Sequence, residues 1–130
     1  MNNSWLTFLD WFFLTFHTLF TLFNILGWIW KKTRKIHLFT MLATLFSWAF
    51  LGIWYGFGYC FCTDWHWQVR ELLGKPVETP SYIAFLAEEI SGIRFAPEVV
   101  DSVVLAVFCA CLALSMWLNV RAILARRRCQ

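Results

Sequence analysis

The chain has 130 residues, of which 60% are apolar, 20% are aromatic and only 15% are charged. This composition is too apolar for an ordinary soluble domain of this length, so it argues against that class and predicts one integral membrane domain over residues 1–130. The net charge of +3 is less informative than where the basic residues lie, because orientation in a membrane follows local Lys and Arg rather than the total.

Residues 5–30 form the first predicted span. They contain no Lys, Arg, Glu or Pro, and they exceed the roughly 20 apolar residues that a helix needs to cross a bilayer. Asp10, His17 and Asn24 recur every seven positions, and Thr21 falls on the same helical face. Lipid offers no hydrogen-bond partner, so we expect this polar seam to face other helices. The stretch lacks the basic start and the cleavage site of a signal peptide, so we expect a retained helix.

A basic run follows at residues 31–35, and the second predicted span covers residues 36–59. So short a connection predicts that the first two spans are antiparallel neighbours. The second span carries a milder polar stripe, which we expect to meet the seam of the first. Its members are His37, Thr40, Thr44 and Ser47.

The segment 60–98 predicts two short amphipathic helices that lie along the membrane surface or cover the mouth of the bundle. Residues with capping side chains or helix-breaking backbones set their limits. The first helix is expected to begin at Thr63 or Asp64 and to end near Leu73. The second is expected to begin at Thr79 and Pro80 and to end at Ser91, with Gly92 as its C-cap.

Pro97 and Glu98 open the last predicted helix, which spans the membrane over residues 102–120 and continues into a basic tail at residues 121–130. Small residues on one face of this helix predict close packing there. They are Ala106, Ala110 and Ala113, while Asp101, Ser115 and Asn119 fall on another face.

The distribution of charge predicts the orientation of these three spans. Basic clusters occupy residues 31–35 and 121–128, whereas residues 64–101 hold seven acidic and three basic residues, a net charge of −4. By the positive-inside rule both basic clusters are cytoplasmic, so the N-terminus and the acidic segment lie outside. The C-terminal arginines then anchor to anionic lipid, and no context for binding nucleic acid accompanies them.

Three groups of side chains have both a functional and a structural interpretation. Cys60, Cys62 and His66 can form a zinc or copper site, a thiol-exchange site or ordinary interfacial packing. His17 can ligate haem, or it can be a neutral interhelical lock bonded to Thr44 or Ser47. His37 lies at the cytoplasmic boundary, too far from His17 along the bundle for the two to share one iron. A third group is charged, and it can be a binding patch on the surface or a set of internal ion pairs. Its members are Arg70, Glu88, Glu89 and Arg94.

The chain resembles the bacterial membrane family known as domain of unknown function 2784 over about residues 10–104. The resemblance rests on His17, His37, a Cys-x-x-Thr motif at Cys60, and the Ile-aromatic pattern of residues 82–85. Phe61 and Cys62 stand where the family motif has proline and leucine, and the glutamate that follows this motif in the family is missing here. The resemblance implies a helical fold in a bacterial inner membrane and no particular reaction.

These features predict an all-α membrane protein with three transmembrane helices and two short helices between the second and third. We expect a non-enzymatic accessory or assembly subunit that packs against itself or against a larger membrane complex, with no cofactor. One alternative is a haem, zinc, copper or thiol redox protein that uses His17 or the Cys60, Cys62 and His66 cluster. A second is an oligomeric small-molecule transporter, because three helices without repeats enclose no path alone.

Overall fold

The computed structural model describes residues 3–56 and 58–130, and every regular element within them is a helix. Three stretches of helix are long and apolar enough to cross a membrane: Asn3–Leu26, Arg34–Tyr55 and Pro97–Arg128. Two shorter helices, α4 (Phe61–Leu72) and α5 (Tyr82–Ser91), lie between the second and the third. The predicted all-α fold with three such helices is confirmed, although several helix ends and contacts differ from the prediction.

Helix α1 (Asn3–Leu26) ends four residues before the predicted boundary at Trp30. The chain turns after Gly27, whose N–H still donates to the Phe23 carbonyl at 2.7 Å, as in the helix. The Thr33 hydroxyl donates to the Gly27 carbonyl, also at 2.7 Å, so the loop itself satisfies a carbonyl that the helix leaves free. The backbone is thus turned toward the next helix before the basic run begins.

Replacement of Gly27 by alanine is expected to destabilise this turn. An added Cβ would lie 2.7 Å from the Phe23 carbonyl oxygen and 2.8 Å from His37 Cδ2, closer than real Cβ contacts. Crowding of this kind costs about 1–3 kcal/mol of unfolding free energy. Thermal unfolding of the purified protein in detergent measures the effect, and a Gly27→Ala variant as stable as the parent would contradict the tight packing of this turn.

The second apolar stretch is less regular than predicted. It consists of α2 (Arg34–Phe46), a π-helical turn η1 (Ser47–Leu51) and α3 (Gly52–Tyr55). It stops short of residue 59 because Gly56 takes a φ of 99°, a conformation that other residues rarely adopt. Phe57, which the prediction placed inside this span, lies outside the described residues.

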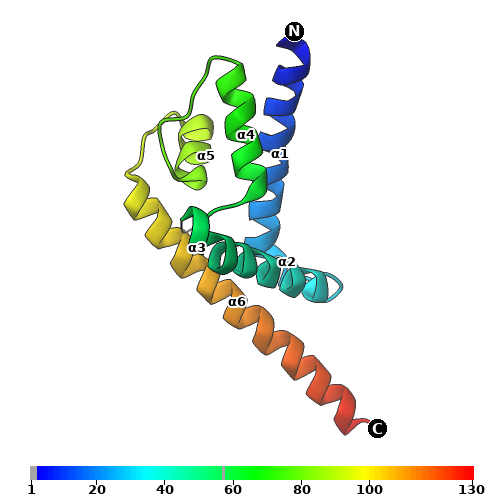
Figure 1. Ribbon diagram of the computed structural model, residues 1–130. Coiled ribbons are helices and arrows are strands. Elements are labelled where there is room, and N and C mark those ends of the chain that lie inside the picture. The colour runs from blue at the N-terminus through cyan, green and yellow to red at the C-terminus, as the bar shows by residue number, and fades with distance from the viewer. Residues whose placement is uncertain (1–2, 57) are drawn as a thin grey trace.

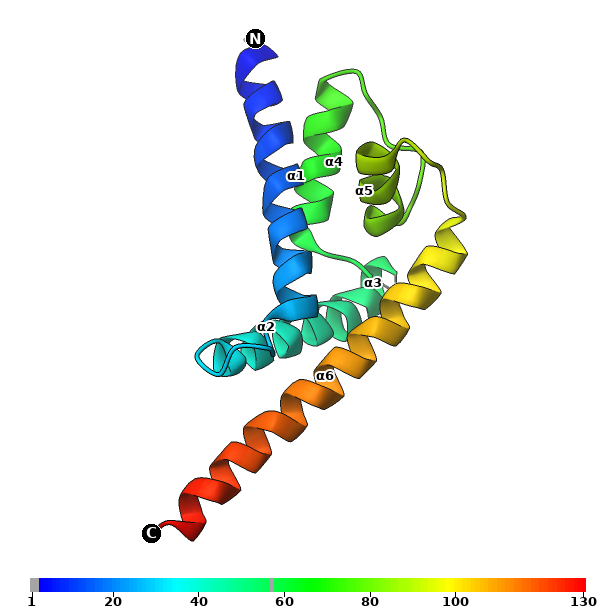
Figure 2. The ribbon, with the colours of Figure 1, turned by 180° about the vertical axis from the view of Figure 1, so that it is seen from behind.

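The arrangement of the helices in space corrects the predicted pairing of the first two spans. In Figures 1 and 2, α2 crosses the end of α1, whereas α4 runs along the side of α1. Helix α6 (Pro97–Arg128) passes across α2, and α5 lies between α4 and the start of α6. The short basic loop therefore brings the two helix ends together without making the helices antiparallel neighbours.

The two short helices begin at other residues than those predicted. Cys60 is the N-cap of α4 and its side chain makes no capping bond, so Thr63 and Asp64 lie inside the helix. The N-cap of α5 is Ser81, whose Oγ accepts from the Ala84 N–H at 3.3 Å, instead of Thr79. Gly92 is the C-cap of α5 with a φ of 72°, which confirms that prediction.

The face of α6 that packs inside the protein is not the predicted alanine face. Ser115 and Phe108 are buried, while the alanines are exposed. Phe108 lies against Trp48 of η1 with ring centroids 4.8 Å apart, and the Asn119 amide donates to the Arg34 carbonyl at 3.2 Å. The alanines do not pack inside this chain because α2 crosses α6 on the polar side. The exposed alanines are Ala106, Ala110 and Ala113.

Candidate functional site

The polar seam of α1 is divided between two sets of partners. Its outer part, Asp10 and His17, faces α4 and α5, whereas its inner part, Asn24, faces α2. The division follows from the fold, because α4 lies along the outer part of α1 and α2 crosses only its inner end. Two buried networks result, each centred on one histidine.

His66 of α4 is the centre of the outer network. Its side chain is fully buried, its Nε2 lies 2.6 Å from Asp10 Oδ1, and its Nδ1 lies 2.9 Å from the Tyr82 hydroxyl. A carboxylate only accepts hydrogen bonds, so Nε2 carries the proton, and in the neutral ring Nδ1 accepts from Tyr82. One imidazole thus joins helices α1, α4 and α5.

Arg70 completes this network one turn further along α4. Its Nη1 donates to Asp10 Oδ1 at 3.3 Å, and its guanidinium carbon lies 4.7 Å from the centre of the Phe85 ring. Its Nη2 is 4.0 Å from Glu89, and its buried Nε has no partner among the described residues. The Asp10 carboxylate therefore serves two donors of α4 at once.

Burial dominates the ionisation of this network. It lowers the pKa of His66 below the usual 6.5, although the hydrogen bond and the charge of Asp10 act in the opposite direction. Arg70 lowers this pKa further, while Glu89 raises it. Burial likewise raises the pKa of Tyr82. The ring and the phenol are therefore both uncharged at neutral pH, and the network acts as a fixed set of hydrogen bonds.

The stability of the protein is expected to fall as the pH drops below about 6.5, because the unfolded chain then binds a proton at residue 66 that the folded protein resists. Above that pH the contribution is fully present and constant. Unfolding free energies measured in detergent across this range give the slope. A His66→Gln variant retains a donor for Asp10 but does not titrate, so its slope should be shallower. Equal slopes in parent and variant would contradict the assignment.

His37 of α2 is the centre of the inner network. It is fully buried, with Nε2 2.8 Å from the Asn24 carbonyl and Nδ1 2.9 Å from the Ser115 hydroxyl. Because a carbonyl only accepts, Nε2 donates, and the neutral ring accepts from Ser115 through Nδ1. The Asn24 side chain accepts from Thr40 at 2.9 Å and lies 3.4 Å from the Thr44 hydroxyl. Helices α1, α2 and α6 are thus joined at one point.

The structure places His17 differently from the predicted interhelical lock. Its Nε2 lies 3.5 Å from Thr63 of α4, and its ring centre lies 4.2 Å from that of Tyr82. It bonds neither Thr44 nor Ser47, and the Ser47 hydroxyl donates to the Tyr59 carbonyl at 2.9 Å. The prediction assumed that α2 runs beside the middle of α1, where the fold has α4 instead.

Two of the histidines, His66 and His37, have no ring nitrogen free to bind a metal or haem. Both ring nitrogens of His66 are engaged by Asp10 and Tyr82, and both ring nitrogens of His37 are engaged by Asn24 and Ser115. Within residues 3–56 and 58–130, no three His, Cys, Asp or Glu side chains are grouped so as to hold a metal ion.

Cys60 and Cys62 remain as free thiols near the start of α4. Burial raises the pKa of Cys62, and the neighbouring Cys60 raises it further. A raised pKa lowers the fraction of reactive thiolate at neutral pH, so the surroundings of Cys62 do not favour thiol exchange.

The partners that complete both networks are not evident from the sequence. In the sequence, Tyr82 belongs only to the family pattern of residues 82–85, and Ser115 only to a polar face of the last helix. Arg70 was considered only with the glutamates, although its position four residues after His66 puts both on one face of α4. That spacing was the available signal, but nothing in the sequence matched this face to Asp10.

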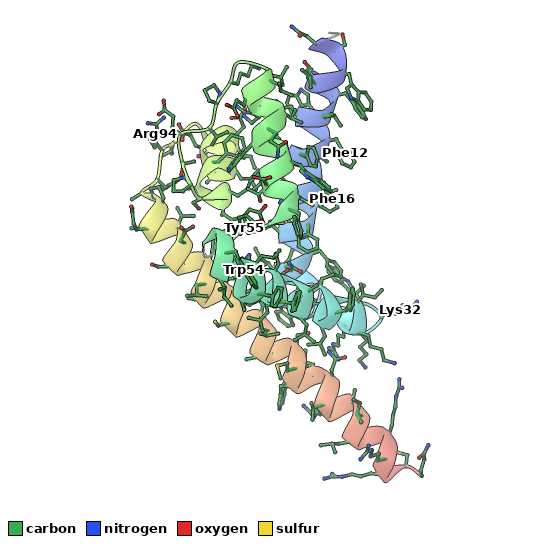
Figure 3. The ribbon with its side chains drawn as sticks, viewed as in Figure 1. Phe12, Phe16, Lys32, Trp54, Tyr55 and Arg94 are labelled. Atoms are coloured by element: carbon green, nitrogen blue, oxygen red, sulfur yellow. The ribbon has the colours of Figure 1, made fainter. Side chains whose placement is uncertain are left out.

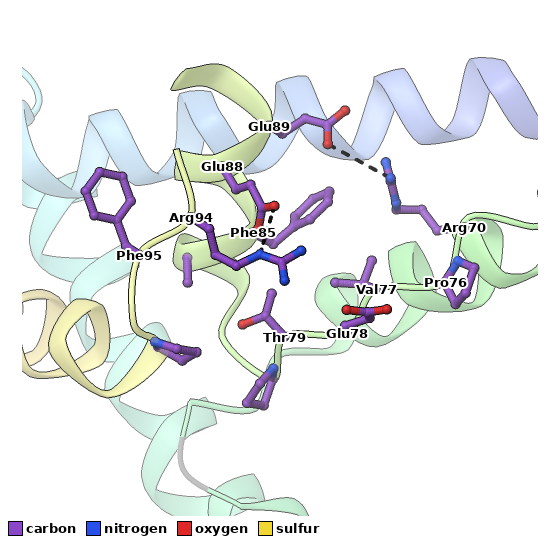
Figure 4. Close-up of a pocket in the computed structure, with 13 residues that line it drawn as sticks. Arg70, Pro76, Val77, Glu78, Thr79, Phe85, Glu88, Glu89, Arg94 and Phe95 are labelled. Carbon is purple, nitrogen blue, oxygen red and sulfur yellow. Dashed lines mark hydrogen bonds and ion pairs between the residues drawn. The ribbon is translucent and has the colours of Figure 1, made fainter. Parts of the chain in front are cut away.

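Two cavities adjoin these networks. The outer one, of about 500 Å³, is lined by both basic and acidic side chains, and Figure 4 shows Arg94 paired with Glu88 there, at 3.2 Å, and Arg70 near Glu89. Its charges are thus largely paired internally, as one of the two interpretations of this group predicted. The inner one, of about 440 Å³, lies between α1, α2, α5 and α6 and has His17 in its wall.

The comparisons with known proteins match this chain to one family. The family described as Protein of Unknown function (DUF2784) matches residues 7–120, and this confirms the resemblance seen in the sequence. No curated protein and no solved structure is similar enough to match the chain. A functional conclusion therefore depends on the geometry of the networks, the cavities and the surface.

Proposed function

We propose, starting from the fact that this chain belongs to the family described as Protein of Unknown function (DUF2784), that it is a non-enzymatic module of a bacterial inner membrane. In this proposal it is an accessory or assembly subunit that associates with itself or with a larger membrane complex. The observation that carries the proposal is the apolar surface, because only about a tenth of the residues in the most apolar part of each long stretch are buried inside the protein.

Exposed aromatic and aliphatic side chains cover all three long helices. Figure 3 shows Phe12 and Phe16 projecting from α1, and Trp54 from α3, where it is 64% exposed. Phe39 of α2 and Trp117 of α6 are also exposed. A continuous surface of this kind is unfavourable in water and suited to hydrocarbon or to neighbouring helices, which supports membrane insertion.

The placement of charge supports the proposed orientation. The N-terminus, α4 and α5 lie at one end of the molecule, and the arginine-rich end of α6 lies at the other (Figures 1 and 2). With residues 31–35 and 126–128 in the cytoplasm, the acidic segment of residues 64–101 lies outside. Helices α4 and α5 then form a cap on the outer side, and their apolar residues pack on α1.

An accessory role is favoured over catalysis because the buried polar groups are used to hold helices together. Both ring nitrogens of His66, and both of His37, are hydrogen-bonded to residues of other helices. The small face of α6, which includes Ala110, is exposed and is of the kind that lets another helix approach closely. In the proposed complex, a helix of a second copy or of a partner protein packs on this face.

The test is the mass of the protein purified in mild detergent, combined with cross-linking in native membranes. We expect an oligomer or a co-purifying membrane protein, and Ala110→Phe should weaken the association. Ala122→Phe is the matched control, because it adds the same bulk at another exposed alanine of α6. A strictly monomeric protein without a co-purifying partner would overturn the proposal.

A further inference from the structure

The inner cavity has the size and the walls of a binding site for a small molecule. Its volume of about 440 Å³ falls in the range of roughly 300–1,000 Å³ that such sites occupy. Apolar side chains from several helices form most of its wall, among them Met41 of α2, Trp48 of η1, and Val104 and Phe108 of α6. An apolar molecule within the bilayer would find similar surroundings inside this cavity.

Two polar groups in the wall retain unused hydrogen-bonding capacity. His17 is only 7% exposed, and the nearest polar contact of its Nε2 is Thr63 at 3.5 Å. Its buried Nδ1 has no partner with hydrogen-bond geometry among the described residues, although the Phe13 backbone lies near this ring. Thr21 lies one turn further along α1, and its hydroxyl makes no hydrogen bond within the described part of the chain. A polar group bound in the cavity would offset the cost of leaving the buried Nδ1 of His17 without a partner.

The charges around the cavity favour a ligand without charge. Among the described residues, no Lys or Arg side chain lines it, so an anionic head group would find no counter-charge there. A carboxylate in the wall, that of Asp101, already accepts a hydrogen bond from the Ser81 hydroxyl. His17 and Thr21 lie well inside α1, where a charged group surrounded by apolar side chains is costly.

We infer that the inner cavity binds one membrane-derived molecule that has an uncharged, oxygen-bearing head group and an apolar tail. The head hydrogen-bonds to His17 and Thr21, and the tail lies among Met41, Trp48 and Phe108. An isoprenoid quinone and a diacylglycerol both have this chemistry. This site is separate from the association surface, so binding is expected whether or not the protein forms a larger complex.

Photo-crosslinking of the full chain in nanodiscs tests the inference. Three photoactivatable probes are used, a quinone, a diacylglycerol and a fatty acid, and mass spectrometry locates the attachment sites. We expect one of the two neutral probes to label residues of the cavity wall and to identify the source of the ligand. Labelling only of outward-facing residues would overturn the inference, and so would equal labelling of the wall by the anionic fatty acid.

Two variants make this test specific. Val104→Trp fills the cavity and should reduce labelling of the wall at least roughly tenfold, as expected when a pocket loses space for its ligand. Val120→Trp adds the same side chain at an exposed position of α6 outside the cavity and should leave labelling unchanged. Equal labelling of both variants would overturn the inference.

His17→Phe provides a measurement that does not depend on filling the cavity. It keeps a ring of similar size and removes the polar contact, so labelling by the neutral probe should fall roughly three- to tenfold, the effect of one lost hydrogen bond. Thr18→Val, on the same helix but outside the cavity wall, is the control. Circular dichroism shows whether each variant retains its helices. Unchanged labelling of His17→Phe would contradict the assignment of His17 as the residue that binds the head group.

Discussion

The Asp10→Ala variant is expected to lose about 3 kcal/mol of unfolding free energy. This is the lower end of the roughly 3–5 kcal/mol lost when one member of a buried ion pair is removed. The carboxylate accepts from His66 at 2.6 Å and from Arg70 at 3.3 Å, and its own side chain is only 15% exposed. Its loss leaves a buried N–H and a largely buried guanidinium without their acceptor. Denaturant unfolding in detergent, followed by far-ultraviolet circular dichroism, measures the change.

Asp64→Ala is the matched control for this variant. Asp64 lies in the first turn of α4, and its carboxylate bonds only to the exposed Gln68 side chain, at 2.9 Å. Removal of such a surface carboxylate should cost less than about 1 kcal/mol. If the two variants lose the same stability, then the outer network does not hold α1, α4 and α5 together as described.

His37→Ala is expected to destabilise the inner end of the protein by a similar amount, about 3 kcal/mol. The ring is fully buried, so its removal leaves a cavity, and it also leaves the Asn24 carbonyl and the Ser115 hydroxyl without their partner. Because this ring joins three helices, the loss should lower the temperature at which α1, α2 and α6 unfold together. Thermal unfolding followed with a probe on each of these helices measures this temperature in the parent and in the variant.

Ser115→Ala isolates the hydrogen bond from the volume of the ring. It leaves the Nδ1 of His37 buried without a donor, which should cost about 1–3 kcal/mol. Ser102→Ala, on the same helix, removes an exposed hydroxyl that donates only to the Glu98 carbonyl, and it should be nearly neutral. Equal stability of these two serine variants would contradict the donor role of Ser115.

Local features of the chain were predictable because they depend on neighbouring residues. The apolar run before residue 27 predicted α1, Gly92 predicted the end of α5, and Pro97 predicted the start of α6. Each of these signals acts within about one turn of helix or along one continuous apolar stretch. The same signals misplaced the start of α5, because Thr79 and Ser81 are both suitable caps and only the packed structure selects Ser81.

The partners of the polar residues were decided by the tertiary structure. The seam of α1 was visible in the sequence, but its contacts reach from Asp10 to His66, 56 residues away, and from Asn24 to Thr44. Periodicity identifies the face on which such residues lie and carries no information about which helix will meet that face. For this reason Cys60 and His66 were grouped by nearness in the chain, although His66 bonds to other helices.

The sequence by itself determined that this chain forms three long apolar helices with polar side chains that require partners, because hydrophobicity and helical period are local properties. Only the tertiary structure decided that α4, rather than α2, runs beside α1, and that decision divided the seam between two histidine networks. It also created the inner cavity beside His17, since the volume left between helices depends on how they cross and on which side chains meet there.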